Sequence, residues 1–227
     1  MGEVGPQRYL KLKAEVEIAD GCYAVCSHGG FTYVAGSSSI SKVNEADWSV
    51  KYFVEEAEVR NITCCGDSLF VLAGDYYYYV RVYSLKTGKL VKSFPHRPSD
   101  AAEISSQTLA VVPGKVVIPD NIQGRMTIYS PKGRIGKHVP CLQLDPGGYA
   151  QETSICVADK DSVVASCADS STVMRIDVSQ RKVVWTSKEV EEPAFVACYG
   201  GEYVIVAGNE PDQTEMFIMD INTGEFK

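Results

Sequence analysis

The sequence predicts an all-β fold, a five-bladed β-propeller whose blades are four-stranded antiparallel sheets. Three observations lead to this prediction. A short apolar segment recurs five times, turn-forming residues recur at fixed offsets from it, and no segment shows a sustained helical period. The five segments are FTYVAG (31–36), LFVLAG (69–74), KVVIPD (115–120), DSVVAS (161–166) and YVIVAG (203–208). Their fifth letters stand 38 to 46 residues apart, a spacing typical of propeller blades.

Two fixed offsets support the register of this repeat. Nine residues before each fifth letter the residue is small, and six residues before it the residue is a turn former. The small residues are Cys26, Cys64, Ala110, Cys156 and Cys198. The turn formers are Gly29, Asp67, Pro113, Asp159 and Gly201. Five units in one register indicate five equivalent blades.

Each unit reads as four short strands, which we call a to d in chain order. Strand a carries the small residue, and a tight turn leads to the apolar strand b. A polar loop leads to strand c, such as VRVYSL, and a turn such as LKTG (85–88) leads to strand d. Strand b is apolar on both faces because a blade packs between two neighbours. The predicted blades span 19–54, 57–94, 105–140, 151–187 and 193–227 of a single domain.

The chain ends predict how the ring closes. The fifth unit runs out after strand c, and an extra strand, Tyr9–Lys13, precedes the first unit. This N-terminal strand can supply strand d of the fifth blade and leave only short protected edges. Two alternatives remain open at this point. The five units can be part of a ring of six to eight blades, or a partial ring that closes by assembling with another chain.

Two segments resemble known propeller repeats. VRVYSLKTGKLVKSF resembles the c–turn–d segment of WD40, YVTN and NHL-type repeats, and MRIDVSQRKVVWTS resembles quinoprotein-like repeats, which often end in a tryptophan such as Trp185. The Gly-His and Trp-Asp dipeptides of WD40 repeats are absent, so the subfamily is not resolved. Related propellers often form the partner-recognition module of RING/B-box ubiquitin ligases. The resemblance therefore implies partner recognition, although this sequence has no RING cysteine–histidine pattern.

Composition narrows the classes of partner and compartment. A net charge of −7 and a pI near 5.1 argue against nucleic-acid binding. No apolar run approaches the length of a membrane span, and the N-terminus lacks the apolar core of a signal peptide. With eight cysteines, we expect a reduced, cytoplasmic chain rather than a disulfide-bonded one. Adjacent Cys64 and Cys65 should point to opposite faces of one strand.

No catalytic or cofactor motif stands out. The sequence has no GxSxG elbow and no phosphate-binding loop. The repeated cysteines lie one per blade, which favours packing of small side chains over a metal site. Carboxylates on the d–a segments could form a glycosidase pair, but an acidic chain is expected to place carboxylates there anyway. We therefore expect no enzyme activity, no cofactor and no metal.

The candidate binding face is the one from which the d–a and b–c loops emerge. The stretch GDYYYYVRVY puts four tyrosines at the second b–c loop, where the other blades have polar residues. Successive residues of a strand alternate in direction, so at most two of these rings share a face. Two long d–a loops, 94–107 and 139–154, open onto the same face. The candidate binding residues are Arg60, Asp75, Tyr76, Tyr77, Tyr78, Asn121, Gln123, Asp169 and Asn209.

These features predict a non-catalytic scaffold that binds a protein or peptide through this loop face. We expect neither a nucleic-acid nor a membrane partner, and a monomer unless partial rings assemble. The alternative is a carbohydrate-binding or glycosidase-type propeller, because five-bladed rings include both. Lectin propellers usually repeat one aromatic site in every blade, whereas the b–c loops here differ from blade to blade.

Overall fold

The computed structural model describes residues 15–18, 21–74, 78–96, 108–120, 124–140, 153–168, 170–208 and 215–227. Within these ranges the chain forms nineteen strands and no helix. The strands form five antiparallel sheets that follow one another along the chain. The predicted all-β fold, a five-bladed β-propeller, is confirmed.

The strands of each sheet are hydrogen-bonded in chain order from the inside to the outside of the molecule. The first sheet contains β1 (Ala24–His28), β2 (Phe31–Ala35), β3 (Ser39–Asn44) and β4 (Val50–Glu55). The second contains β5 (Val59–Cys65), β6 (Ser68–Ala73), β7 (Tyr78–Ser84) and β8 (Leu90–His96). The third contains β9 (Ala110–Val112), β10 (Lys115–Asp120), β11 (Arg125–Tyr129) and β12 (Ile135–Pro140). The fourth contains β13 (Thr153–Val157), β14 (Ser162–Cys167), β15 (Thr172–Asp177) and β16 (Lys182–Ser187).

The fifth sheet has three strands in the described part of the chain: β17 (Pro193–Tyr199), β18 (Tyr203–Gly208) and β19 (Met216–Asp220). The strand predicted to complete it, residues 9–13, lies outside the described residues. Closure of the ring by this strand therefore stays a prediction.

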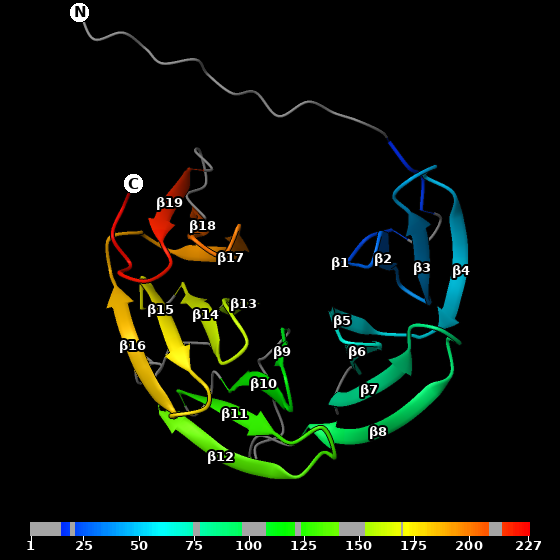
Figure 1. Cartoon of the computed structure of the whole chain (residues 1–227), viewed down its shortest axis with the longest axis horizontal. Coiled ribbons are helices and arrows are strands. Elements are labelled where there is room, and N and C mark those ends of the chain that lie inside the picture. Colours follow the sequence, from blue (N-terminus) through cyan, green and yellow to red (C-terminus); the bar gives the residue numbers. More distant parts are fainter. Residues whose placement is uncertain are drawn as a thin grey trace, which may run out of the picture.

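Figure 1 shows the five sheets arranged as blades along an arc, with β1, β5, β9, β13 and β17 on the inside. Each of these inner strands packs beside the inner strand of the next blade, from β1 to β5 and onward to β17. The strands β1 and β17 stand at the two ends of the arc and do not pack closely against each other. The first and fifth blades therefore each have one face without a neighbouring blade in the described structure.

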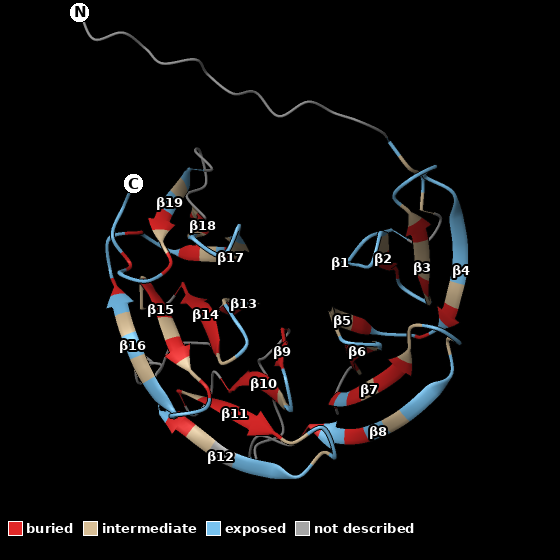
Figure 2. Cartoon of the chain, viewed as in Figure 1, coloured by how far each residue is buried: buried red, intermediate tan, exposed pale blue. Residues whose placement is uncertain are grey.

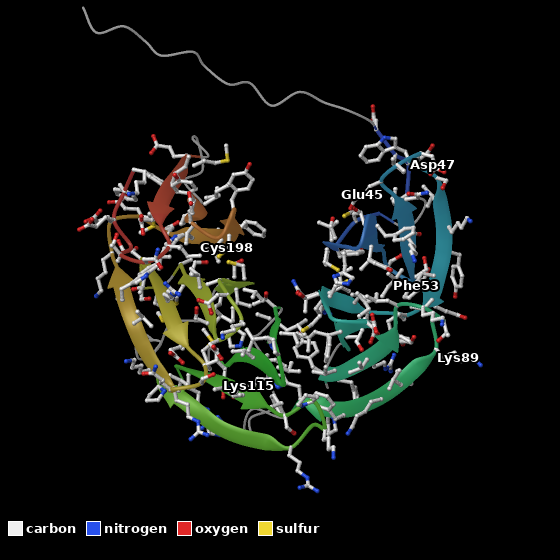
Figure 3. All side chains as sticks on the ribbon, viewed as in Figure 1. Glu45, Asp47, Phe53, Lys89, Lys115 and Cys198 are labelled. Atoms are coloured by element: carbon white, nitrogen blue, oxygen red, sulfur yellow. The ribbon has the colours of Figure 1, made fainter. Side chains whose placement is uncertain are left out.

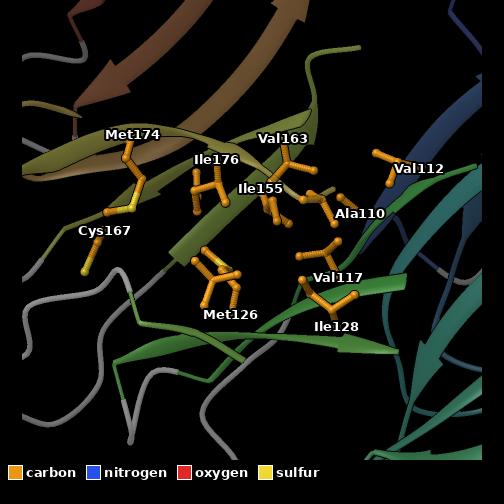
Figure 4. Packing of buried hydrophobic residues seen from close by; sticks show 13 residues of the cluster. Ala110, Val112, Val117, Met126, Ile128, Ile155, Val163, Cys167, Met174 and Ile176 are labelled. Carbon is orange, nitrogen blue, oxygen red and sulfur yellow. The ribbon is translucent and has the colours of Figure 1, made fainter. Parts of the chain in front are cut away.

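The core lies between blades. In the described chain, four apolar clusters each join two neighbouring blades. Burial is greatest in the middle strands, as Figure 2 shows, and every residue of β14 is buried. Figure 4 shows the cluster between the third and fourth blades, where Met126 and Ile128 face Ile176 and Ile155. This two-sided burial explains why the repeated strand b is apolar throughout rather than alternating.

Two structural features that recur from blade to blade contribute to blade packing. The outer pair of strands has a register shift in each of the four complete sheets, which increases the local twist of the blade. In addition, a glycine of the c–d turn abuts an aromatic ring on strand d of the preceding blade. A Cβ added to Gly133 would overlap the ring of Phe94, and one added to Gly224 would overlap the ring of Trp185. At Gly88, an added Cβ would press on the backbone carbonyl of Phe53 at 3.0 Å and touch its ring at 3.8 Å.

The corresponding position of the first blade is Trp48. Its backbone amide donates to the carbonyl of Asn44, as that of Gly88 does to Ser84. Trp48 has a φ of 58°, so it adopts the left-handed conformation that the glycines adopt elsewhere. Within the described residues no blade precedes the first one, and Trp48 is 41% exposed.

Candidate functional site

The predicted loop face is only partly described. Of the nine candidate residues, Arg60 and Tyr78 lie within the described ranges. The other seven, Asp75, Tyr76, Tyr77, Asn121, Gln123, Asp169 and Asn209, lie outside them. Their part in binding stays a prediction.

The two described candidates both support the scaffold. Tyr78 begins β7, is 5% exposed and packs in the cluster between the second and third blades. Arg60 donates from Nε to the carbonyl of Gly74 at 3.2 Å and so fastens the start of β5 to the end of β6. The next tyrosine, Tyr79, is 37% exposed, which follows from the alternation along the strand.

One buried carboxylate, on the same side of the molecule as the loop face, was not predicted from the sequence. Glu56, between the first and second blades, is 2% exposed. Its two carboxylate oxygens accept hydrogen bonds from Arg81 and from the hydroxyl of Tyr83, both on β7. Burial and the hydrogen bond to Glu56 raise the pKa of Tyr83. Because both carboxylate oxygens are hydrogen-bonded inside the protein, Glu56 is placed to link the two blades rather than to act as an acid–base group.

The inner strands line a central cavity, which we call the channel. This cavity has a volume of about 1030 Å³ and is lined by residues of β1, β5, β9, β13 and β17. Four of the repeated cysteines lie on its wall: Cys26, Cys64, Cys156 and Cys198. The fifth equivalent position is Ala110 on β9, which is 1% exposed.

These cysteines meet in pairs across two blade junctions. The sulfur atoms of Cys26 and Cys64 lie 3.3 Å apart, between the first and second blades. Those of Cys156 and Cys198 lie 3.1 Å apart, between the fourth and fifth. Figure 3 labels Cys198 on the inner side of the fifth blade, facing the fourth. Because blade three has Ala110, the stripe of small residues forms two separate thiol pairs.

One thiol of each pair donates to the other. The hydrogen bond from Cys26 lowers the pKa of Cys64, and the pKa of Cys26 is raised by the same bond and by burial. In the second pair, the hydrogen bond from Cys156 and the nearby Arg175 guanidinium lower the pKa of Cys198, while the pKa of Cys156 is raised. Each pair therefore combines one thiol that ionises more easily with a partner that ionises less easily.

The face of the fifth blade that points away from the fourth is largely apolar, and no described residue of another blade covers it. Antiparallel pairing places its residues in rows across β17, β18 and β19, such as Phe195–Ala207–Met216 and Ala197–Ile205–Ile218. We call the set made by these two rows, Tyr199 and Tyr203 the fifth-blade end face. Phe195, Tyr199, Met216 and Ile218 are 60%, 68%, 69% and 49% exposed.

The opposite face of the same three strands shows the contrast. Its rows contain Val196, Val204, Val206 and Met219, which are all at most 2% exposed because they pack against the fourth blade. Both faces carry large apolar side chains, yet within the described residues only one of them packs against another blade.

The first blade presents a more mixed surface at the other end of the arc. Val25, Val50 and Tyr52 are 59%, 41% and 65% exposed. On the same face, the hydroxyl of Thr32 donates to Glu45 at 2.9 Å and accepts from the hydroxyl of Ser27 at 2.8 Å. This end therefore combines exposed apolar side chains with a small hydroxyl–carboxylate network.

The fold is decided by the repeated four-stranded sheets, their order and their packing through the inner strands. The chain is a β-propeller.

Comparison with known proteins agrees with the propeller fold but does not identify a family. No family model matches, and no curated protein matches. By contrast, 1051 chains of solved structures match. One of them, from a crystal structure of the mitotic checkpoint complex, has a TM-score of 0.64 and 14% sequence identity. The match covers 97% of this propeller and 74% of that chain. At this identity, the similarity shows the fold alone.

Within the described residues of the propeller, no three His, Cys, Asp or Glu side chains gather so that they could hold a metal ion. No helix in the same ranges has the length and apolar character needed to cross a bilayer.

Proposed function

We propose that the propeller is a non-catalytic scaffold and that its fifth-blade end face is a seat for a protein partner. The observation that supports this most is the exposure of four large apolar side chains, Phe195, Tyr199, Met216 and Ile218, on one continuous sheet face. Monomeric proteins rarely leave contiguous apolar surface of this kind open to water, and such patches mark interaction sites. Aromatic residues and methionine are also enriched in protein interfaces.

The chemistry of this face suits a partner that supplies an apolar β-sheet. The other side of β17–β19 already packs against such a sheet, that of the fourth blade. Across the rest of the arc, each blade covers its neighbour in the same way. We therefore expect the partner to approach along the arc and lie against the fifth blade as a further blade would.

The loop face remains a second contact region in this proposal. Asp75, Tyr76, Tyr77, Asn121, Gln123, Asp169 and Asn209 are its candidate contacts, while Tyr78 and Arg60 support the loops from below. A module of this kind fits a larger assembly inside the cell, such as a RING/B-box ubiquitin ligase. The similarity to a chain of a multi-protein complex is in keeping with a scaffold role.

The test compares two double variants in affinity capture from extracts of the native cell type. Phe195→Asp with Met216→Asp places two charges on the end face, in one cross-strand row. The matched control is Val91→Asp with Val184→Asp, which alters two exposed residues on the outer strands β8 and β16. Thermal melts first establish that both variants are folded.

We expect the end-face variant to lose one or more protein partners that the wild type and the control capture. If all three capture the same proteins to the same extent, the end face is not the binding surface. A second copy is the other source of an apolar sheet face, and light scattering on the wild type would detect it as a dimer.

Enzyme and lectin activity are tested separately on the wild type. Turnover of simple glycosides or esters would overturn the non-catalytic assignment. Specific binding on a glycan array would favour the carbohydrate alternative over a protein partner.

A further inference from the structure

The two thiol pairs are not used by the proposed scaffold function, and their placement is unusual. Free cysteines usually serve as small apolar residues, which need no thiol partner. Here each of the four sulfurs lies within 3.3 Å of a second one that comes from the neighbouring blade. The residues within each pair are 38 and 42 positions apart in sequence, so the blade packing alone brings them together.

We infer that Cys26–Cys64 and Cys156–Cys198 are two modification sites for thiol-directed oxidants of the peroxide class, each closing to a disulfide between neighbouring blades. The sulfurs already touch, so each pair must close by only about 1 Å to reach the S–S bond length. The small-molecule oxidant reaches them through the channel, whose wall contains all four residues.

The reaction begins with the thiolate form of one cysteine in each pair. The Cys64 thiolate attacks one oxygen of hydrogen peroxide, whose O–O bond breaks to leave a sulfenic acid on Cys64 and hydroxide. The Cys26 sulfur then attacks the Cys64 sulfur, the new S–S bond forms and the S–O bond breaks. The departing hydroxyl and the Cys26 proton leave as water, and the first hydroxide takes up the proton that Cys64 lost.

The balance per pair is two thiols and one hydrogen peroxide giving one disulfide and two waters. Cys198 takes the place of Cys64 in the second pair, with Cys156 as the resolving thiol. The electrostatics agree with these roles, because hydrogen bonding lowers the pKa of Cys64 and Cys198 and raises that of their partners.

Two other cysteines in the described part of the chain lie in different surroundings. Cys65 follows Cys64 directly but packs into the cluster on the other face of its blade, and Cys167 is 1% exposed in a third cluster. Ala110 occupies the position between Cys64 and Cys156 in the stripe, so neither of these meets a thiol from the equivalent position of the third blade. Among the seven cysteines of the described residues, the structure thus brings these two pairs to contact distance.

The experiment oxidises the purified full chain with hydrogen peroxide at neutral pH and maps linked peptides by mass spectrometry without reduction. We expect Cys26–Cys64 and Cys156–Cys198 linkages, with these thiols lost about tenfold faster than the unpaired Cys22. Linkages that mix the two pairs, or loss of Cys22 before the paired thiols, would overturn the assignment.

Two variants test the assignment of the linkages, and a second probe that does not oxidise thiols tests the pairing independently. Cys156→Ala copies the residue of blade three and should abolish the second linkage while leaving Cys26–Cys64 intact; Cys167→Ala should leave both. Phenylarsine oxide, which binds closely spaced dithiols, should take up two equivalents in the native wild type and in Cys167→Ala, and one in Cys156→Ala. Uptake of no equivalent by the wild type, or of two by Cys156→Ala, would contradict the pairing.

Discussion

Gly224 of the fifth blade lies directly against the indole of Trp185 in the fourth blade. A Cβ on Gly224 would come within 2.7 Å of the ring, and the indole nitrogen donates to the carbonyl of Ile221 at 3.0 Å in the same turn. The c–d turn of the last blade therefore packs against Trp185, and this is the last of the glycine–aromatic contacts that recur along the chain. Blade packing in this propeller depends on these turns as well as on the apolar clusters.

Replacing Gly224 by alanine should destabilise the protein more than its backbone conformation alone explains. Its φ of 76° costs a non-glycine residue about 1 kcal/mol. The clash with Trp185 should add about 1 to 3 kcal/mol, as overpacking does in a core. Gly200→Ala is the control, because Gly200 has a φ of 63° and nothing within 4 Å of an added Cβ. Urea unfolding should separate the two variants; equal losses would show that the indole moves aside freely.

A buried histidine should make stability fall in mild acid. His96 is fully buried, and its Nδ1 lies 2.7 Å from the hydroxyl of Tyr129. Burial lowers the pKa of His96 to about 4 from its ordinary 6.5. The unfolded chain therefore takes up a proton below pH 6.5 that the folded chain refuses. The stabilisation is complete above pH 6.5 and is lost as the pH falls toward 4, by about 3 kcal/mol in total.

His96→Gln should remove this part of the pH dependence. Urea midpoints between pH 7.5 and pH 4.5 measure it, and His28→Gln, at an exposed position, is the control that should keep the wild-type pH dependence. If wild type and His96→Gln lose stability in parallel, the histidine is not the titrating group.

Cys156→Ala should fold and lose about 1 kcal/mol of stability, because Ala110 fills the equivalent position of blade three while remaining buried. Val164→Ala is the comparison. Val164 pairs with Cys156 across the strands and is fully buried, so its truncation should cost about 2 to 3 kcal/mol. A loss above about 3 kcal/mol for Cys156→Ala would exceed the cost of removing one small buried group. The two positions would then not be equivalent.

Deleting residues 1–14 tests the closure predicted for the fifth blade. If Tyr9–Lys13 pairs with β19, its removal exposes the edge of a strand whose Met216 and Ile218 are already open on one face. Exposed apolar edges pair with other chains, so the truncated protein should dimerise or aggregate and melt at a lower temperature.

Leu10→Asp with Leu12→Asp should act in the same direction, and Lys11→Asp with Lys13→Asp is the matched control on the alternate positions. Light scattering and thermal melts report both. A monomeric truncation with an unchanged melting temperature would show that the N-terminus is a tail.

The repeat in the sequence was sufficient to predict the blades because strand burial and turn chemistry are local. The small residues nine positions before each marker do lie on the inner strands, and Cys64 and Cys65 do point to opposite clusters. The pairing of the cysteines was not predictable in the same way. It depends on the rotation between neighbouring blades, which no single blade's sequence encodes.

The fifth-blade end face was missed for a related reason. The strand YVIVAG carries apolar residues on both faces, like its four counterparts, so its sequence gave no sign that one face lacks a neighbour. Tyr78 illustrates the opposite case. Alternation predicts that half of the tyrosine run faces inward, but only the position of the strand start shows that Tyr78 is among the buried ones.

The chain contains two tryptophans, and they stand near opposite ends of the arc. Trp48 is 41% exposed on the turn of the first blade, whereas Trp185 contacts the turn of the last one. Their fluorescence therefore reports on two separate events. Burial of Trp48 by a ligand at its end of the arc would shift emission to the blue, and detachment of the last blade would expose Trp185 and shift it to the red. The single variants Trp48→Phe and Trp185→Phe each leave one tryptophan, so the two events can be followed separately without an added label.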